Sequence, residues 1–222
     1  YQFKIPENKS MVIKNAIEKI DFVEKPKDKI NLIYHTTPWR GLVHLLKIFK
    51  SLNSTNVVLN VCSSTIIYGK KFDSVLGKKY EGIFNECKNT KNVNYLGFLE
   101  NKKIIELLKK MHIFAHPSIW PETSCVAAIE AMAAGCETVT TNLGALYETC
   151  SPFGTFVNFD RNFDNLEKRY SKVLSNSIKN YWSAENQKKL KLQRETINAT
   201  YSWNVRCIEW KNFFNEAREL KV

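Results

Sequence analysis

The residues with the clearest chemical potential lie in the middle of the chain, between residues 116 and 130. An apolar run ends at His116, a proline-rich turn follows, and Glu122 comes directly after that turn. Thr123 and Ser124 are favourable N-cap residues, so we expect a helix to begin there and to leave its first backbone amides without partners. Free amides at the positive end of a helix are suited to binding an anion such as a phosphate group.

A second carboxylate, Glu130, would lie about two turns inside the same helix. It would share a face with the small or apolar residues Val126, Ala127 and Ala134, where burying a carboxylate is costly without partners. Because a carboxylate can accept two hydroxyl groups with its two oxygens, a sugar or ribose diol is a suitable partner. The alternative is that Glu122 only interacts with the helix dipole and that Glu130 is solvated.

A possible cationic partner follows the first apolar run. Thr36, Thr37 and Arg40 surround a proline in a turn between that run and the next amphipathic stretch. Residues 111–160 contain no Lys or Arg, so an anion bound there would need a cation from elsewhere in the fold, and Arg40 is the candidate. The alternative is a surface arginine that caps a turn. A Gly-x-Gly-x-x-Gly or Walker sequence is absent, which argues against dinucleotide and P-loop sites.

Short apolar runs alternate with segments of helical periodicity, as in βαβ units. Several runs are continuously apolar, which favours a parallel sheet covered on both faces. We therefore predict an α/β fold, a Rossmann-like doubly wound parallel sheet with C-terminal helices, whose carboxyl edge holds the groups above. The predicted strands are Ile30 to Tyr34, Val57 to Val61, Val93 to Leu96, Ile113 to His116, Thr138 to Thr141 and Thr155 to Val157, and the predicted helices between them are Leu42 to Leu52, Ser74 to Cys87, Lys102 to Met111 and Ser124 to Ala134.

The pattern divides the chain into three parts. Residues 1–28 are charged and contain two prolines, which is typical of a linker or incoming segment, whereas residues 29–200 carry the predicted sheet and its helices. Residues 201–222 form a last predicted helix, from Trp203 to Leu220. Because the sequence begins with Tyr1 rather than Met, we expect a fragment or a processed product.

The net charge of +11 first suggests a polyanionic partner. However, 27 of the 33 basic residues are Lys, spread over segments with helical pattern, whereas specific phosphate and base recognition favours Arg. We therefore expect no specific nucleic-acid partner and assign most Lys residues to solvated faces. The sequence has no apolar run of eighteen residues and no leader-like start, so we expect neither a membrane span nor a signal peptide.

The six cysteines show neither a C-x-x-C pair nor a zinc-like spacing. A chain of 222 residues can bury a large core without disulfides, so we expect reduced cysteines packed as small apolar residues. This favours a reducing compartment, the cytoplasm, with peripheral association at the cytoplasmic face of a membrane as a further option. No metal site is expected.

Five motifs occur in a characteristic order along the chain. They are T-x-x-x-R-G-L at Thr36 to Leu42, N-V-x-x-L-G at Asn92 to Gly97, P-S-x-x-x-E at Pro117 to Glu122, E-A-M-A-A-G at Glu130 to Gly135 and N-L-G-A-L-x-E at Asn142 to Glu148. Together they resemble the C-terminal, nucleotide-sugar-binding domain of group 1, family 4 type, retaining glycosyltransferases with the GT-B fold. The resemblance covers roughly residues 12–215.

The resemblance implies a nucleoside-diphosphate sugar as donor substrate, transfer with retention, and no metal or other cofactor. Glu122 and Arg40 would be the catalytic residues, Glu122 at the hydroxyls of the transferred sugar and Arg40 at the diphosphate. Glu130 would contact the ribose diol. The other residues expected to bind the donor are Thr36, Thr37, Gly41, Gly97, Phe98, Leu99, Thr123, Ser124, Cys125 and Val126.

In this family an N-terminal domain holds the acceptor, here a glycan, a lipid-linked molecule or a protein. We expect that domain to be missing, the last helix to pack toward it in the whole enzyme, and this half to be inactive alone. The alternatives are a non-catalytic nucleotide-sugar or nucleic-acid binding module, and a GT-B fold epimerase or phosphorylase. The chain departs from the family pattern in having Cys125 where Gly is frequent and Glu137 where Pro is common. His116 could act as a base or be a packed residue at the end of a strand.

Overall fold

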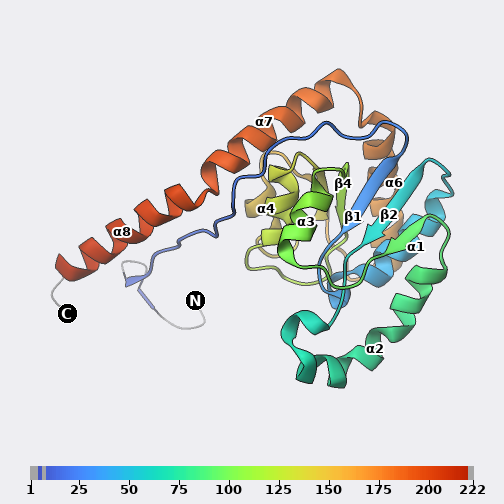
Figure 1. Ribbon diagram of the computed structural model, residues 1–222, viewed down its shortest axis with the longest axis horizontal. Coiled ribbons are helices and arrows are strands. Elements are labelled where there is room, and N and C mark those ends of the chain that lie inside the picture. The colour runs from blue at the N-terminus through green and yellow to red at the C-terminus, as the bar shows by residue number, and fades with distance from the viewer. Residues whose placement is uncertain (1–4, 7–8, 220–222) are drawn as a thin grey trace.

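The computed structural model describes residues 5–6 and 9–219 and centres on one sheet of six parallel strands (Figure 1). The strand order is β3-β2-β1-β4-β5-β6, so the chain winds outward from β1 in one direction and then from β4 in the other. This confirms the predicted doubly wound α/β fold. The strands are β1 (Ile30–Tyr34), β2 (Val57–Val61), β3 (Val93–Tyr95), β4 (Ile113–His116), β5 (Glu137–Thr141) and β6 (Thr155–Val157).

Helices cover both faces of the sheet. On one face α1 packs against α6, and on the other α4 packs against α3 and α7. The prediction set the start of α2 at Ser74, whereas the helix begins at Lys70. The helices are α1 (Leu42–Leu52), α2 (Lys70–Asn89), α3 (Asn101–Leu108), α4 (Val126–Ala133), α5 (Leu146–Cys150), α6 (Phe163–Asn180), α7 (Ala184–Thr200) and α8 (Trp203–Glu219), with 3-10 turns η2 (Pro38–Arg40) and η3 (Ile66–Tyr68).

The alternation of side chains along the inner strands explains the two cores. In β1, Leu32 belongs to the core beside α1 and α6, whereas Ile33 belongs to the core beside α4. In β4, Ile113 and Phe114 divide in the same way. All four side chains are fully buried, which accounts for the continuously apolar sequence of these strands.

The N-terminal segment and the C-terminal helices run alongside each other (Figure 1). Ile17 forms a parallel bridge with Ser202 and its amide donates to the carbonyl oxygen of Tyr201. Helix α8 then extends away from the sheet, with Trp203, Ile208 and Phe214 at least half exposed. Leu220, the predicted end of this helix, and residues 1–4 and 7–8 of the predicted linker lie outside the described residues. Within the described part of the chain, the model contains no helix that is both long and apolar enough to cross a membrane.

Candidate functional site

The candidate site lies at the carboxyl edge of the sheet, where the strand order reverses between β1 and β4. Ligands of open α/β sheets bind at such a switch point. Four loops surround a cavity of about 540 Å³ there, within the usual range for small-molecule sites. Its lining residues are His35, Thr36, Thr37, Arg40, Cys62, Ser64, Ile67, Tyr68, Gly97, Phe98, Leu99, Asn101, Ile104, Ser124, Val126, Ala127 and Glu130.

Two glycines bring the loops of this edge into close contact. Gly41 has φ of +133°, and a Cβ atom there would lie 2.2 Å from the carbonyl oxygen of Pro117. Gly144 has φ of +62°, and a Cβ atom would lie 2.6 Å from the amide nitrogen of Glu122. Side chains larger than hydrogen would therefore force the loops apart. Gly41 does not line the cavity; its absence of a side chain lets the loop after β1 approach the loop after β4.

The close approach places Arg40 beside Glu122, two residues that are far apart in the sequence. An Arg40 guanidinium nitrogen lies 2.9 Å from Glu122 Oε1, and the Glu122 side chain is only 3% exposed. His116 Nε2 lies 3.6 Å from the same oxygen. The alternative from the sequence was that Glu122 interacts only with the helix dipole, but the carboxylate is buried and paired with Arg40. The arrangement holds the guanidinium at the wall of the cavity.

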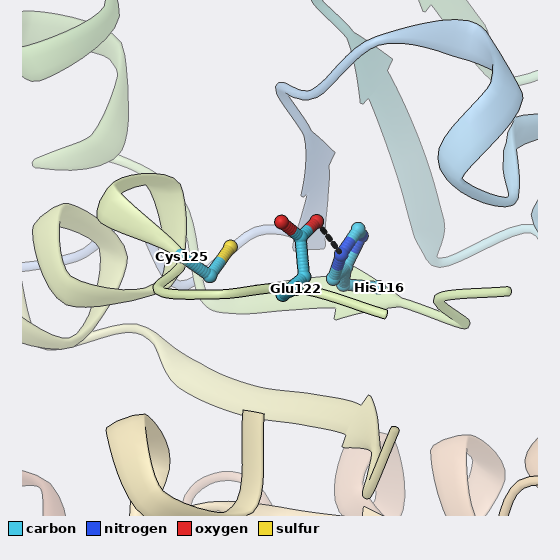
Figure 2. A group of neighbouring side chains, drawn as sticks. All are labelled: His116, Glu122 and Cys125. Atoms are coloured by element: carbon cyan, nitrogen blue, oxygen red, sulfur yellow. Dashed lines mark ion pairs between the residues drawn. The ribbon is translucent and has the colours of Figure 1, made fainter. Parts of the chain in front are cut away.

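Figure 2 shows His116 and Cys125 on either side of the Glu122 carboxylate. Their nitrogen, oxygen and sulfur atoms lie within 4.8 Å of one another, so they could form a metal site that the sequence spacing did not suggest. However, a divalent cation would compete with Arg40 for Glu122. It would also require a thiolate, and burial raises the pKa of Cys125 to about 12. The charge balance of the group therefore fits Arg40 better than a metal ion.

The helix expected to begin at Thr123 or Ser124 begins later. Cys125 is the N-cap of α4 and makes no side-chain capping bond. The preceding residues stay extended because Glu122 bridges to Gly144 and its carbonyl oxygen accepts from the amide of Ala145. Ser124 Oγ instead accepts a hydrogen bond from Asn15 Nδ2 at 2.9 Å. The predicted N-cap residues are thus wrong, but the N-terminal end of α4, at Val126 and Ala127, does border the cavity.

Glu130, from α4, lines the same cavity as the residues of the loop after β1 and is 8% exposed. Burial raises the pKa of its carboxyl group, while a hydrogen bond from Asn101 opposes the shift. Asn101 Nδ2 donates to Glu130 Oε1 at 2.8 Å. Asn101, Ile67 and Tyr68 also line the cavity and were not predicted from the sequence. Asn101 comes four residues after Gly97, so its closeness in sequence to the predicted donor-binding residues Gly97 to Leu99 could have indicated it.

The structure brings most of the predicted donor-binding residues to one cavity. Those that line it are Thr36, Thr37, Arg40, Gly97, Phe98, Leu99, Ser124, Val126 and Glu130. Four others do not line it. Thr123 is exposed, Cys125 is buried below α4, Gly41 is a backbone contact and Glu122 lies behind Arg40.

Several buried polar atoms at this edge lack a hydrogen-bond partner among the described residues. They include Thr37 Oγ1, Ser63 Oγ and Arg40 Nε. A buried polar group without a partner costs about 1 to 3 kcal/mol. Their accumulation beside one cavity indicates a site built to receive a polar ligand.

Comparison with known proteins identifies the family. The model of the family "Glycosyl transferases group 1" matches residues 14–191. An uncharacterized glycosyltransferase, MJ1607, of Methanocaldococcus jannaschii is 26% identical over 240 residues, covering 98% of this chain and 57% of the relative. The chain spans about half the length of the curated relatives it matches.

Solved structures with low sequence identity share the fold. A glycosyltransferase from Rickettsia africae has a TM-score of 0.73 and 19% identity, over 96% of this chain and 59% of that one. Anabaena Alr3699/HepE, solved in complex with UDP and glucose, has a TM-score of 0.67 and 13% identity, over 85% of this chain and 49% of that one. The chain belongs to the group 1 glycosyltransferase family and has the Rossmann-like fold of the C-terminal half of a GT-B enzyme.

Proposed function

We propose that the cavity binds a nucleoside-diphosphate sugar as the donor of a glycosyl transfer. The observation that carries this proposal is that Arg40 and Glu130 line one cavity. Arg40 is the one Lys or Arg among the cavity-lining residues of the described chain, which suits it to the diphosphate. Glu130 presents a buried carboxylate to the ribose diol.

The donor would occupy the cavity from one wall to the other. The nucleoside would lie beside Gly97, Phe98 and Leu99, and the diphosphate would lie between Arg40 and the N-terminal end of α4. Charge that develops on the leaving diphosphate would be stabilised by the guanidinium and by the helix end, without a metal ion. Glu122 would hold Arg40 in place through their ion pair, and it would reach the transferred sugar only if its carboxylate turned toward the cavity.

The likeness to HepE, which binds UDP, supports a uridine nucleotide as the first ligand to test. Because the chain covers 57% of the MJ1607 relative, we propose that the acceptor is held by a further domain. From the resemblance to retaining glycosyltransferases, we also propose that transfer proceeds with retention. The acceptor would be a glycan, a lipid-linked molecule or a protein. Free cysteines, five of them buried, suit the cytoplasm, which we propose as the compartment.

A ligand screen tests the proposal directly. Thermal unfolding is measured with UDP, GDP, ADP and UDP-glucose, because a ligand that binds the native state raises its stability by RT ln(1 + [L]/Kd). We expect one nucleoside diphosphate to stabilise the chain, and calorimetry then gives its Kd. Arg40→Ala should weaken binding about 100-fold, since charge-assisted hydrogen bonds contribute about 1.5 to 3 kcal/mol each.

The controls separate this proposal from its rivals. Lys103→Ala changes an exposed cation on α3 outside the cavity lining and should leave the Kd unchanged. Arg40→Lys keeps the charge but loses the bidentate fork, so intermediate binding is expected. Binding of DNA that falls steeply with salt and is indifferent to Arg40→Ala would instead indicate a nucleic-acid module.

A further inference from the structure

Asn101 and Glu130 meet inside the cavity although they come from different helices. Asn101 is the first residue of α3, Glu130 lies in the middle of α4, and both line the cavity. Asn101 Nδ2 donates to Glu130 Oε1 at 2.8 Å. The two side chains therefore form one polar unit on the wall that the nucleoside would contact.

This hydrogen bond leaves the rest of the carboxylate available. A carboxylate accepts about four hydrogen bonds through its two oxygens, and the contact with Asn101 occupies one site on Oε1. Burial raises the pKa of Glu130, which favours the neutral acid, whereas donation from the Asn101 amide favours the charged carboxylate. Asn101 thus supports the protonation state in which Glu130 can accept two hydroxyl groups.

Asn101 makes no use of its side chain for the helix that it begins. The N-cap of α3 is Glu100, and no side-chain capping bond is made there. Local helix formation therefore does not explain the residue, whereas the contact with Glu130 does.

We propose that Asn101 is a positioning residue that holds Glu130 as a carboxylate directed at the ribose hydroxyls, which makes the site selective for ribonucleotides. The inference rests on the proposed donor function. Glu130 itself makes the contact with the ligand, and Asn101 acts through it. Removing Asn101 should consequently weaken only those ligands that have ribose hydroxyls.

The experiment compares UDP with 2′,3′-dideoxy-UDP by calorimetry on the 222-residue chain; if GDP gives the larger stabilisation in the screen, the guanine pair is used. We expect Asn101→Ala to raise the Kd of UDP about tenfold and that of the dideoxy analogue less than twofold, because one charge-assisted contact is lost. Lys102→Ala, a neighbouring exposed change, should alter neither value.

Two further variants separate positioning from folding. Asn101→Asp keeps the side-chain shape but replaces the donor with a second carboxylate, so it should weaken UDP binding more than Asn101→Ala does. In the Glu130→Ala background, Asn101→Ala should cause no further loss, because the residue it serves is gone. The melting temperature of each variant without ligand shows whether it folds.

The outcomes are distinguishable. If the unaltered chain binds no nucleoside diphosphate, the proposed function is wrong and this inference with it. If UDP binds and Glu130→Ala weakens it, but Asn101→Ala affects UDP and its dideoxy analogue equally or affects neither, the donor site stands and the role of Asn101 is wrong. If Asn101→Ala weakens UDP binding as much in the Glu130→Ala background as in the unaltered chain, Asn101 does not act through Glu130 and its proposed role is wrong.

Discussion

The two edges of the sheet differ in the hydrogen bonding of their buried charged groups and hydroxyls. At the amino edge, Lys25 Nζ donates to the carbonyl oxygens of Leu108 and Ala134 at 3.1 and 2.9 Å. The Glu137 carboxylate there accepts from Thr155, Ser177 and Asn186. At the carboxyl edge, by contrast, Thr37 Oγ1, Ser63 Oγ and Arg40 Nε have no partner among the described residues.

We infer that the hydrogen-bonded groups at the amino edge stabilise the fold, and that the unpartnered groups at the carboxyl edge contribute to ligand binding. The bonds of Lys25 and Glu137 join the incoming segment and α7 to the helix ends at the amino edge. Two buried atoms near this edge, Thr138 Oγ1 and Gln193 Oε1, have no partner among the described residues. The carboxyl edge keeps loops close through Gly41 and Gly144 but leaves donors and acceptors open. We therefore expect substitutions at the amino edge to change stability and those at the carboxyl edge to change binding.

Lys25→Ala should give the largest effect on stability. The substitution removes one of the donors to the carbonyl oxygen of Leu108, which also accepts from the Met111 amide, and leaves the carbonyl oxygen of Ala134 without Lys25. Each lost hydrogen bond of this kind costs about 1 to 3 kcal/mol. We expect the free energy of unfolding in urea to fall by about 3 kcal/mol, while the Kd for UDP of the folded protein stays within about twofold.

Lys27→Ala is the matched control, because Lys27 makes an exposed ion pair with Glu24 and should change stability by less than about 0.5 kcal/mol. A small stability loss in Lys25→Ala, or a large change in UDP affinity, would remove the distinction between the edges.

A pH dependence should follow from one histidine at each edge. Burial lowers the pKa of His112 at the amino edge to about 4 and that of His35 at the carboxyl edge to about 3. Below pH 6.5 the unfolded chain protonates both while the folded chain does not, so stability falls as the pH decreases from about 6.5 toward 4. Each histidine contributes a slope of about 1.4 kcal/mol per pH unit.

Unfolding in urea at pH 7, 6 and 5 measures this slope. His112→Gln should reduce the slope by the contribution of one histidine. The variant should also be less stable at pH 7, because both ring nitrogens of His112 make hydrogen bonds, to Asn31 and Pro26. An unchanged slope in this variant would mean that His112 is protonated in the folded state.

The fold could be predicted from sequence because its strands are short apolar runs between helical segments. The predicted strands differ from the observed ones only at the ends of β3 and β5. Glu137 was left out of β5 as a charged residue, but the side chains around it satisfy its carboxylate and let the strand begin there. The local sequence pattern therefore predicts where helices and strands lie, whereas the hydrogen-bond partners of Glu137 come from residues far along the chain.

The site was predicted less completely for the same reason. The start of α4 was misplaced because Ser124 binds Asn15 and Glu122 bridges to Gly144, contacts that local capping preferences do not contain. The pairing of Arg40 with Glu122 joins loops that follow two different strands. The turn residues suggested a ligand at this edge, but only the assembled sheet determines which polar groups are left open.

The smallest expected effect compares one threonine at each edge. Thr37→Val removes a buried hydroxyl that has no partner and lines the cavity, so stability should stay the same or rise slightly. If this hydroxyl contacts the diphosphate, the Kd for UDP should rise about fivefold to tenfold. Thr155→Val removes a hydroxyl that donates to Glu137 Oε1 at 3.2 Å. It should lower stability by about 1 kcal/mol without changing the Kd for UDP.

Urea unfolding and calorimetry measure the stability and the Kd for UDP of both variants. The distinction between the edges is supported only if Thr37→Val changes the Kd alone and Thr155→Val changes the stability alone. If Thr37→Val destabilised the chain as much as Thr155→Val, the hydroxyl of Thr37 would have a structural partner, and the open edge would have to be explained by the remaining groups alone.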